Sequence, residues 1–434
     1  MNDECFYFGK SNFNLGCILG FACALITVIV PTVLCEPDDK HPNKQQAVGH
    51  LMPLGQQRLP EGSVHKVIGF PDAKRFFDDY VQQNEPVVFK GAANHIPAFK
   101  LWTDTYLNEK YGHIRVSAEQ GKKENRSEKS FLLPLSEFLQ VYRTEDVYMV
   151  QDLTEAFHAD YSLPPCLSCG GFERGLEVGT IWFSSGDTQS VLHMDDVDNI
   201  NCLLDGQKEL VLIDREYDYL VEAEHWHQEG TYSDVDVAAV DLNKFPSLGQ
   251  APWWKAVVEA GDCIFIPYRW YHSVYSTPGR NLAVNLFFAH RLWLDEKDCD
   301  SKPEHPQDQY ESLAKYRINS LHPEHVAVDK MRADIFEVFE GEPEIDLEYA
   351  TDVWEDIMDP AEIQALFEAF DTNKDMILSW KEIYDADILE LLGDFPFLLP
   401  ENVDEQYEKP RDWQDGDEMD ADHYQSSHHE HGEL

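Results

Sequence analysis

Two histidines and one aspartate have the residue types and the spacing to bind a single metal ion. In His193-Met194-Asp195 one residue separates the two polar side chains, so on a strand both face the same side. A second histidine, His272, follows a turn much further along the chain. Two imidazoles and a carboxylate on one face of an ion leave positions open, as in non-haem Fe(II) oxygenases. The His-x-Asp pair on its own also fits an ordinary polar strand end.

A turn signal after this motif predicts what surrounds the metal ligands. Asp205-Gly206 is typical of a two-residue hairpin turn, and closing it pairs Leu203 with Lys208. Lys208 then shares one face of the hairpin with Asn199 and Asn201. A lysine in this position can bind a dicarboxylate through charge-assisted hydrogen bonds, or it can extend to solvent at the strand end.

A second predicted hairpin adds another amide. If residues 277–280 form a four-residue loop, Ser276 pairs with Asn281 and His272 lies opposite Asn285. This register places Asn285 beside the expected metal ligand, and a slip of one residue would turn it to the other face.

The elements that must position these residues are short strands. Helical patterns at 72–82 and 104–111 precede them, an extended run lies at 86–90, and the pattern beyond residue 308 is again helical. Closely spaced strands without helices between them predict an antiparallel barrel or sandwich. The expected strands are 179–183, 200–204, 208–213, 256–259, 263–267, 272–275 and 282–288.

Taken together, these residues resemble a JmjC domain of the cupin superfamily. The resemblance covers residues 64–294, and the run at 86–92 is also similar to the N-terminal part of small JmjC hydroxylases. Two motif blocks carry it, and they contain Gly179-Thr180-Ile181-Trp182-Phe183, Ser190, His193, Asp195, Asn199, Gly206 and Lys208, then Ala260-Gly261-Asp262, Ile266-Pro267, Trp270, His272 and Val284-Asn285.

The resemblance implies an all-β double-stranded β-helix core (a jelly roll, or cupin fold) with flanking helices. It also implies Fe(II)- and 2-oxoglutarate-dependent oxygenation. The residues carried over by position are the iron ligands His193, Asp195 and His272, then Lys208 and Ser190 for the distal carboxylate of 2-oxoglutarate, and Asn199 and Asn285 beside this cosubstrate.

A second metal site is predicted in the C-terminal part. Residues 371–382 match a twelve-residue EF-hand loop, which predicts a small α-helical EF-hand-like domain, and residues 335–358 are its expected degenerate partner. Met376 stands where such loops have glycine, at a cost on the order of 1 kcal/mol. An acidic loop between two helices is the alternative. The predicted Ca²⁺ ligands are Asp371, Asn373, Asp375, the carbonyl of Ile377, and Glu382.

The two ends of the chain predict its compartment. Residues 15–34 form an apolar run long enough to span a bilayer, as a signal-anchor or a cleaved signal peptide. The last residues, His431-Gly432-Glu433-Leu434, resemble an endoplasmic reticulum retention signal. We therefore expect a protein of the endoplasmic reticulum lumen or membrane, attached through the N-terminal segment if it stays uncleaved.

Five cysteines follow the expected signal segment at residues 1–35. Cys166 and Cys169 are spaced as a local disulfide or a reactive pair. Cys202 and Cys263 lie in apolar strand-like runs and are expected to be buried thiols.

Charge separates the chain into two parts and excludes one class of partner. The net charge is −47, and residues 295–434 alone contain 41 acidic and 10 basic side chains. Such acidity argues against nucleic acid as a ligand, because a phosphate backbone requires Lys and Arg. The expected domains are a signal segment (1–35), a linker (36–60), the oxygenase domain (61–294), a helical connector (295–345), the EF-hand-like domain (346–397) and an acidic disordered tail (398–434).

Three functions are consistent with these features. The first is an oxygenase that hydroxylates a protein or peptide side chain, and the complete ligand set with Lys208 favours it. The second is a calcium-binding luminal protein with a catalytically silent cupin domain. The third is a histone or protein demethylase, which predicts a nuclear protein. Related hydroxylases often dimerise through C-terminal helices, and residues 306–339 are the candidate for a homodimer interface.

Overall fold

A computed structural model describes most of the chain between residues 47 and 386. The described residues are 47–122, 130–221, 226–227, 231–303, 306, 310–318, 344–355, 358–379, 382–383 and 386. The apolar run at 15–34, the C-terminal motif, the tail at 398–434 and most of the candidate dimer segment lie outside them. Among the described residues, no helix is both long and apolar enough to cross a membrane.

The core consists of two facing antiparallel sheets between which the chain passes back and forth. One sheet contains β8, β10, β15 and β17, and the other contains β9, β11, β14 and β16. This alternation is a double-stranded β-helix, so the predicted fold of the core is confirmed. The strands are β8 (Leu176–Ser184), β9 (Thr188–Gln189), β10 (Asp198–Asp205), β11 (Gln207–Ile213), β14 (Trp254–Glu259), β15 (Cys263–Ile266), β16 (Tyr271–Ser276) and β17 (Asn281–Phe288).

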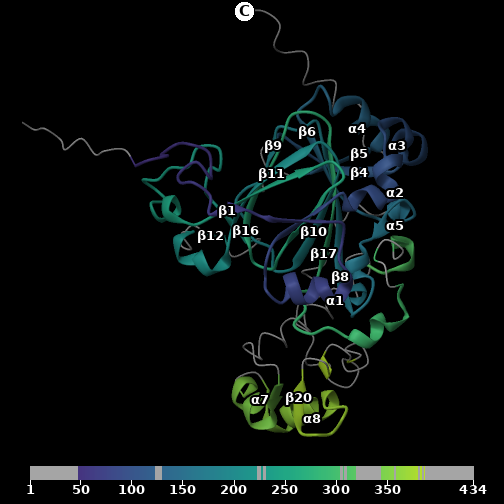
Figure 1. Cartoon of the computed structure of the whole chain (residues 1–434), viewed down its shortest axis with the longest axis vertical. Coiled ribbons are helices and arrows are strands. Elements are labelled where there is room, and N and C mark those ends of the chain that lie inside the picture. Colours follow the sequence, from purple (N-terminus) through teal and green to yellow (C-terminus); the bar gives the residue numbers. More distant parts are fainter. Residues whose placement is uncertain are drawn as a thin grey trace, which may run out of the picture. The chain divides into compact units, whose positions relative to one another are not determined.

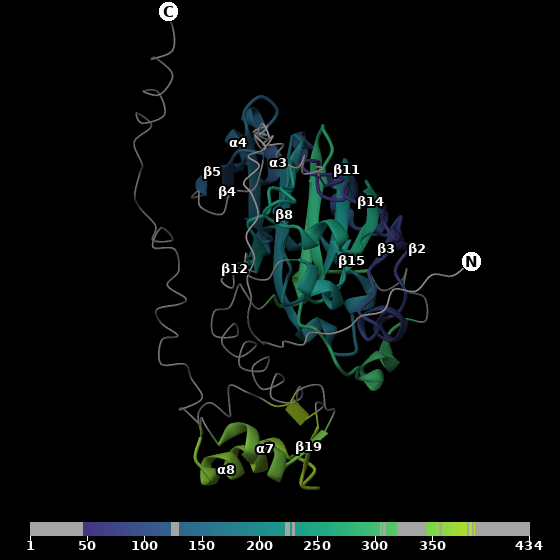
Figure 2. The ribbon, with the colours of Figure 1, turned by 90° about the vertical axis from the view of Figure 1, so that its left-hand side faces the viewer.

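Further strands widen both sheets. Figure 2 shows β2 and β3 next to β15 at one edge of the larger sheet, and β4 and β5 at the opposite edge. The short β1 lies parallel to β14 in the other sheet. These strands are β1 (Gly62–Ser63), β2 (His65–Ile68), β3 (Val87–Lys90), β4 (Arg115–Gln120), β5 (Phe131–Pro134) and β6 (Val147–Asp152).

Helices α2, α3, α4 and α5 lie together on one side of the strands (Figure 1). The helix predicted at 104–111 is confirmed, with Thr103 accepting a hydrogen bond from the Tyr106 N–H as its N-cap. The helix predicted at 72–82 consists of a short α-helix followed directly by a short π-helix. The bounds are α1 (Ala73–Phe76), η1 (Phe77–Val81), α2 (Pro97–Leu101), α3 (Asp104–Tyr111), α4 (Leu135–Val141) and α5 (Glu155–His158).

Strand alternation gives β10 two different faces. Ile200, Cys202 and Leu204 belong to the large apolar core that includes α1 and the aromatic side chains of Phe76 and Phe265. The opposite face, with Leu203, packs into the smaller core between the two sheets. Asn199 and Asn201 alternate with the apolar residues and therefore point between the sheets, where the site lies.

Neither predicted hairpin forms. β10 pairs with β15 and β17, whereas β11 pairs with β14 and β16, so Asp205 and Gly206 turn a corner between sheets. Gly206 has φ 88°, and a Cβ there would lie 2.7 Å from the Arg280 carbonyl oxygen. A tight Asp-Gly turn can join two strands of one hairpin or two strands in different sheets. Here the pairing of β10 and β11 with distant strands places them in different sheets. For the same reason Asn285 lies opposite Asn201 and Thr180, and His272 lies opposite Leu212.

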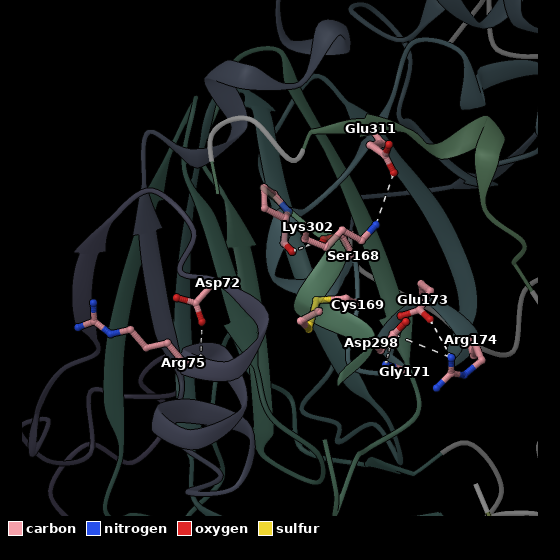
Figure 3. Close-up of a disulfide and its surroundings, with 12 residues drawn as sticks. Asp72, Arg75, Ser168, Cys169, Gly171, Glu173, Arg174, Asp298, Lys302 and Glu311 are labelled. Atoms are coloured by element: carbon pink, nitrogen blue, oxygen red, sulfur yellow. Dashed lines mark hydrogen bonds and ion pairs between the residues drawn. A yellow bond between two sulfur atoms is a disulfide. The ribbon is translucent and has the colours of Figure 1, made fainter. Parts of the chain in front are cut away.

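The predictions for the cysteines are wrong, both for the local pair at 166 and 169 and for the two buried thiols. Cys202 and Cys263 are direct neighbours in the β10–β15 register and form a disulfide. Cys169 is joined to Cys299, which leaves Cys166 as a buried free thiol. In Figure 3 this second disulfide lies beside Gly171 and Asp298, whose carboxylate accepts the Gly171 N–H at 3.2 Å. The pairing depends on which strands and loops are neighbours, and the spacing of cysteines along the chain does not determine this.

Two segments outside the core differ from expectation. Residues 47–60 are not a free linker, because the Leu51 and Leu54 N–H groups donate to the carbonyls of Val240 and Val237. The described part of the expected helical connector contains only short elements. These are η8 (Glu296–Ser301), β18 (Glu311–Ser312) and η10 (Leu313–Lys315). Short elements elsewhere in the described chain are η2 (Ala92–His95), β7 (Ser162–Leu163), η3 (Pro165–Leu167), η4 (Phe172–Arg174), η5 (Arg215–Leu220), β12 (Trp226–His227), β13 (Tyr232–Ser233) and η7 (Ser247–Gln250).

The C-terminal described residues form a small unit with its own apolar core. Helices α7 (Leu347–Trp354) and α8 (Pro360–Phe370) pack around Phe367 and Phe370. Strands β19 (Glu344–Asp346) and β20 (Ile377–Ser379) pair antiparallel, with Ile345 opposite Leu378. Leu378 is the eighth residue of the predicted EF-hand loop.

Candidate metal and cosubstrate site

The three predicted iron ligands converge at one end of the space between the sheets. The ligand atoms of His193, Asp195 and His272 all lie within 4.8 Å of one another. The two imidazole rings are 4.1 Å apart, and His272 Nε2 is 3.6 Å from Asp195 Oδ2. Among the described residues, no other group of three His, Cys, Asp or Glu side chains meets this criterion.

Main-chain pairing brings together ligands that are distant in the sequence. His193 and His272 exchange two backbone hydrogen bonds, of 3.0 and 2.7 Å. The segment with His193 is flanked on its other side by Thr231–Ser233, since the Met194 N–H donates to the Thr231 carbonyl at 3.0 Å. The ligands thus lie on backbone that is fixed from two sides.

Hydrogen bonds also determine which imidazole nitrogen faces the centre. Nδ1 of His193 lies 2.9 Å from the Val191 carbonyl oxygen, and Nδ1 of His272 lies 2.9 Å from the Trp270 carbonyl oxygen. A carbonyl only accepts, so each Nδ1 is the protonated donor and each Nε2 has its lone pair free. This tautomer is the one that a histidine needs to bind a metal through Nε2. Two imidazoles and one carboxylate therefore fit an Fe(II) ion.

A cavity of about 210 Å³ extends from these ligands between the sheets. It contains a buried lysine: the side chain of Lys208 is almost inaccessible, and its ammonium donates to Ser276 Oγ at 2.9 Å. Among the described residues no carboxylate pairs with this ammonium. Burial lowers the pKa of Lys208 to about 8. A buried cation without an anion is costly, which indicates that a ligand supplies the anion.

The distance between the two ends of the cavity suits a short dicarboxylate. His272 and Ser276 lie four residues apart on β16, about 13 Å along a strand, and His272, Val274 and Ser276 all line the cavity. The Lys208 side chain, opposite Ser276, occupies part of this length. A five-carbon diacid with one end beside His193 would be long enough to bring its other carboxylate to the Lys208 ammonium.

The other predicted residues also line the cavity, in different roles. The Ser190 hydroxyl donates to the Val191 carbonyl and accepts the Val274 N–H, so it braces the main chain. The Asn285 Nδ2 group donates to Asn199 Oδ1 at 3.0 Å, and Asn201 donates in turn to Asn285. The three amides form a ladder across β10 and β17.

Several cavity residues were missed by the sequence reasoning. Ser276, the partner of Lys208, was assigned to a hairpin that does not form. The Tyr148 ring on β6 packs at a tilt against the Trp182 ring on β8, with 5.8 Å between ring centroids, and Glu119 on β4 also lines the cavity. A sequence signal for this strand was present, because residues 147–150 are Val-Tyr-Met-Val, rich in β-branched and aromatic residues that favour strands.

The predicted calcium loop is closed by its own hydrogen bonds. The Glu382 carboxylate accepts the Ser379 N–H at 3.1 Å and the Asn373 N–H at 3.3 Å. Asp371 Oδ1 accepts the Asp375 N–H at 3.2 Å. These carboxylates are not brought as close together as the ligands of the first site. Met376 has φ 68°, in the left-handed region expected for a glycine position.

Comparison with known proteins agrees with this fold and site. A double-stranded β-helix with a His-Asp-His cluster inside defines a cupin. The chain belongs to the cupin-like domain family, whose match covers residues 73–292, just over half of the 434 residues. Its relatives include JmjC-type enzymes, so the predicted resemblance is confirmed.

The relatives are named for different substrates. Lysine-specific demethylase 8 of Xenopus tropicalis is 26% identical over 51% of this chain and 51% of its own length. The bifunctional peptidase and (3S)-lysyl hydroxylase JMJD7 of Homo sapiens is 24% identical over 50% and 81%. The tRNA wybutosine-synthesizing protein 5 of Gallus gallus is 30% identical over 50% and 74%. The chain spans about half the length of the first of these relatives.

Proposed function

We propose that this chain is an Fe(II)- and 2-oxoglutarate-dependent oxygenase that hydroxylates a protein side chain in the secretory pathway. The observation that carries the proposal is the pair of complementary groups in one cavity. At one end are two imidazole Nε2 atoms and a carboxylate, and at the other is the buried Lys208 ammonium, with which no carboxylate in the described part of the chain pairs.

Different residues of the cavity bind the metal, orient the cosubstrate and exclude water. When bound, Fe(II) and 2-oxoglutarate supply the oxidising power, because decarboxylation of the 2-oxo acid to succinate activates oxygen for hydroxylation of a C–H bond. His193, Asp195 and His272 hold the ion on one face and leave the other face for ligands. Lys208 and Ser276 orient the distal carboxylate. Leu210, Val274 and Ile266 exclude water from the reacting atoms.

A protein or peptide is the substrate class best supported. The names of two relatives specify lysine as the target, in one case by demethylation and in the other by hydroxylation. The chain's strong negative charge suits a basic segment better than a nucleic acid. Hydroxylation is preferred to demethylation of chromatin because of the compartment.

Two disulfides support a secretory location. Cys202–Cys263 and Cys169–Cys299 are each formed between distant parts of the chain, and such bonds persist in oxidising compartments. The apolar run at residues 15–34 supports the same location. A tagged protein should therefore co-localise with endoplasmic reticulum markers, and nuclear staining would favour the demethylase alternative instead.

The oxygenase is tested by succinate formation from 2-oxoglutarate with extracts of secretory proteins as substrate. Formation should require both Fe(II) and 2-oxoglutarate, and His193→Ala should abolish it. Wild-type protein that binds metal yet forms no succinate under any condition would support the silent-cupin alternative. Comparing hydroxylated luminal proteins in cells with wild-type and His193→Ala protein then identifies the substrate.

We also propose that the C-terminal unit binds one Ca²⁺ ion. Asp371 and Glu382 are both buried, and among the described residues neither pairs with a Lys or Arg side chain. Two buried carboxylates in one loop favour a cation between them. The pairing of Ile345 with Leu378 resembles the contact between paired EF-hand loops, although residues near 345 lack the ligand pattern. Calorimetry should give one site per chain, lost in Glu382→Gln.

A further inference from the structure

Beyond the three ligands lies a fully buried carboxylate that the proposed reaction does not use. Asp198, at the start of β10, has a side chain with 0% exposure. Its Oδ1 atom accepts the Tyr268 N–H at 2.8 Å, and its Oδ2 atom accepts from His290 Nδ1 at 2.9 Å. No Lys or Arg side chain pairs with it in the described part of the chain. A buried carboxylate held by one backbone N–H and one imidazole is costly unless it serves the local geometry.

The position of Asp198 connects the segments that carry the metal ligands. It lies three residues after Asp195 on the same segment. Tyr268 belongs to the turn between β15 and β16, and this turn leads directly to His272. His290 follows the end of β17. One carboxylate therefore links the Asp195 segment, the His272 turn and the end of a core strand.

Three further contacts hold the turn between β15 and β16 against the Asp195 segment and against His290. The Arg269 N–H donates to the Asp195 carbonyl at 2.9 Å, and Arg269 Nε donates to Asp196 Oδ1 at 2.6 Å. Arg269 has φ 59°, a left-handed conformation that a non-glycine residue adopts only when its surroundings hold it. The Tyr268 and His290 rings stack at 4.9 Å with 19° between their planes.

We propose that Asp198 and His290 are positioning residues for the metal centre, which set the orientation of the Asp195 carboxylate relative to the two imidazoles. The backbone pairing of His193 with His272 fixes the imidazoles but not Asp195, which lies beyond that pairing. Asp195 is instead fixed through the turn that Asp198 holds. This inference rests on the proposed metal site and adds two residues to it.

The test is equilibrium binding of Co(II), followed by its visible absorption, without cosubstrate or turnover. Partners that orient metal ligands typically contribute 10- to 100-fold in metal affinity. Asp198→Asn should therefore lower Co(II) affinity by about 10- to 100-fold and change the absorption band. His290→Ala should lower it in the same direction, and His290→Gln, which keeps an N–H donor, should restore part of the loss.

Asp262 provides a matched control. It is also buried, and its carboxylate accepts the N–H groups of Gly91 (2.9 Å) and Glu259 (3.2 Å) and pairs with the Lys90 ammonium (2.5 Å). It lies just before the start of β15, at the opposite end of that strand from Tyr268. Asp262→Asn should cost stability in thermal unfolding but leave Co(II) affinity within about twofold, as expected for a carboxylate that touches no ligand-bearing segment.

The outcomes separate the two claims. Wild-type affinity in folded Asp198→Asn and His290→Ala proteins would overturn the positioning role while leaving the metal site intact. An equal loss in Asp262→Asn would overturn it too, since the loss would then reflect general destabilisation. If Asp198→Asn does not fold, the pair His290→Ala and His290→Gln decides. Wild-type protein that binds no Co(II) would overturn the metal site itself.

Discussion

At the scale of residues, hydrogen-bond partners orient the side chains of the site. His193 and His272 are oriented by carbonyl acceptors, and Lys208 by one hydroxyl. Burial holds the pKa of Lys208 at about 8, well below that of an exposed lysine. This makes cosubstrate binding sensitive to pH in an accessible range.

The KM for 2-oxoglutarate should rise as pH increases through about 8. Below the pKa of Lys208 the ammonium is charged and attracts the distal carboxylate, and above it the amine is neutral. Lys208→Met should raise KM about 10- to 100-fold at pH 7, the loss expected for a charge-assisted hydrogen bond, and remove this pH dependence. A KM that is flat in wild-type protein between pH 7 and 9.5 would contradict the role of Lys208.

What the sequence predicts at this scale follows from local alternation. His193 and Asp195 share a face because they are two residues apart, and Lys208 points inward because β11 alternates. Ser276, Asp198 and His290 were not predictable, since their roles depend on strands and turns brought together by the fold. Which residues interact in this way depends on which segments are neighbours in the folded structure.

At the scale of elements, pairing between distant strands overrides local turn signals. Asp205-Gly206 has the chemistry of a hairpin turn, yet β10 and β11 lie in different sheets, and each pairs with strands that are distant in the sequence. The same non-local register makes Cys202 and Cys263 direct neighbours. A strand list can be predicted from sequence here, but the order of strands in a sheet cannot.

Removing the β10–β15 disulfide should destabilise the core. The double variant Cys202→Ala/Cys263→Ala should lose about 2–4 kcal/mol of unfolding free energy, because the cross-link restricts the unfolded chain. Chemical denaturation measures this. Cys166→Ala is the control, since it removes one buried sulfur and no disulfide. Equal losses in the two proteins would show that the disulfide adds nothing.

Calcium affinity should increase when the strained loop position is relieved. Met376 has φ 68° and a side chain that is 55% exposed, so Met376→Gly removes backbone strain and no packing. The relief is on the order of 1 kcal/mol, or about a fivefold lower Kd. Calorimetric titration of both proteins checks it. A weaker site in the glycine variant would contradict the EF-hand interpretation.

At the scale of the whole molecule, charge limits the choice of partner. With a net charge of −47, the chain has few cations to replace the counterions of a nucleic acid. Electrophoretic mobility shifts with structured RNA at physiological salt should show no complex at micromolar protein. A salt-dependent complex would direct the substrate search to RNA.

The most direct test of the central claim is anaerobic titration of the Fe(II)-loaded protein with 2-oxoglutarate, followed by the visible absorption of the chelate. Wild-type protein should bind one equivalent and develop this absorption. His193→Ala should show none, and Lys208→Met should develop it only at about 10- to 100-fold higher 2-oxoglutarate concentration. Wild-type protein that gives no such absorption, or a His193→Ala protein that gives the same, would contradict the account.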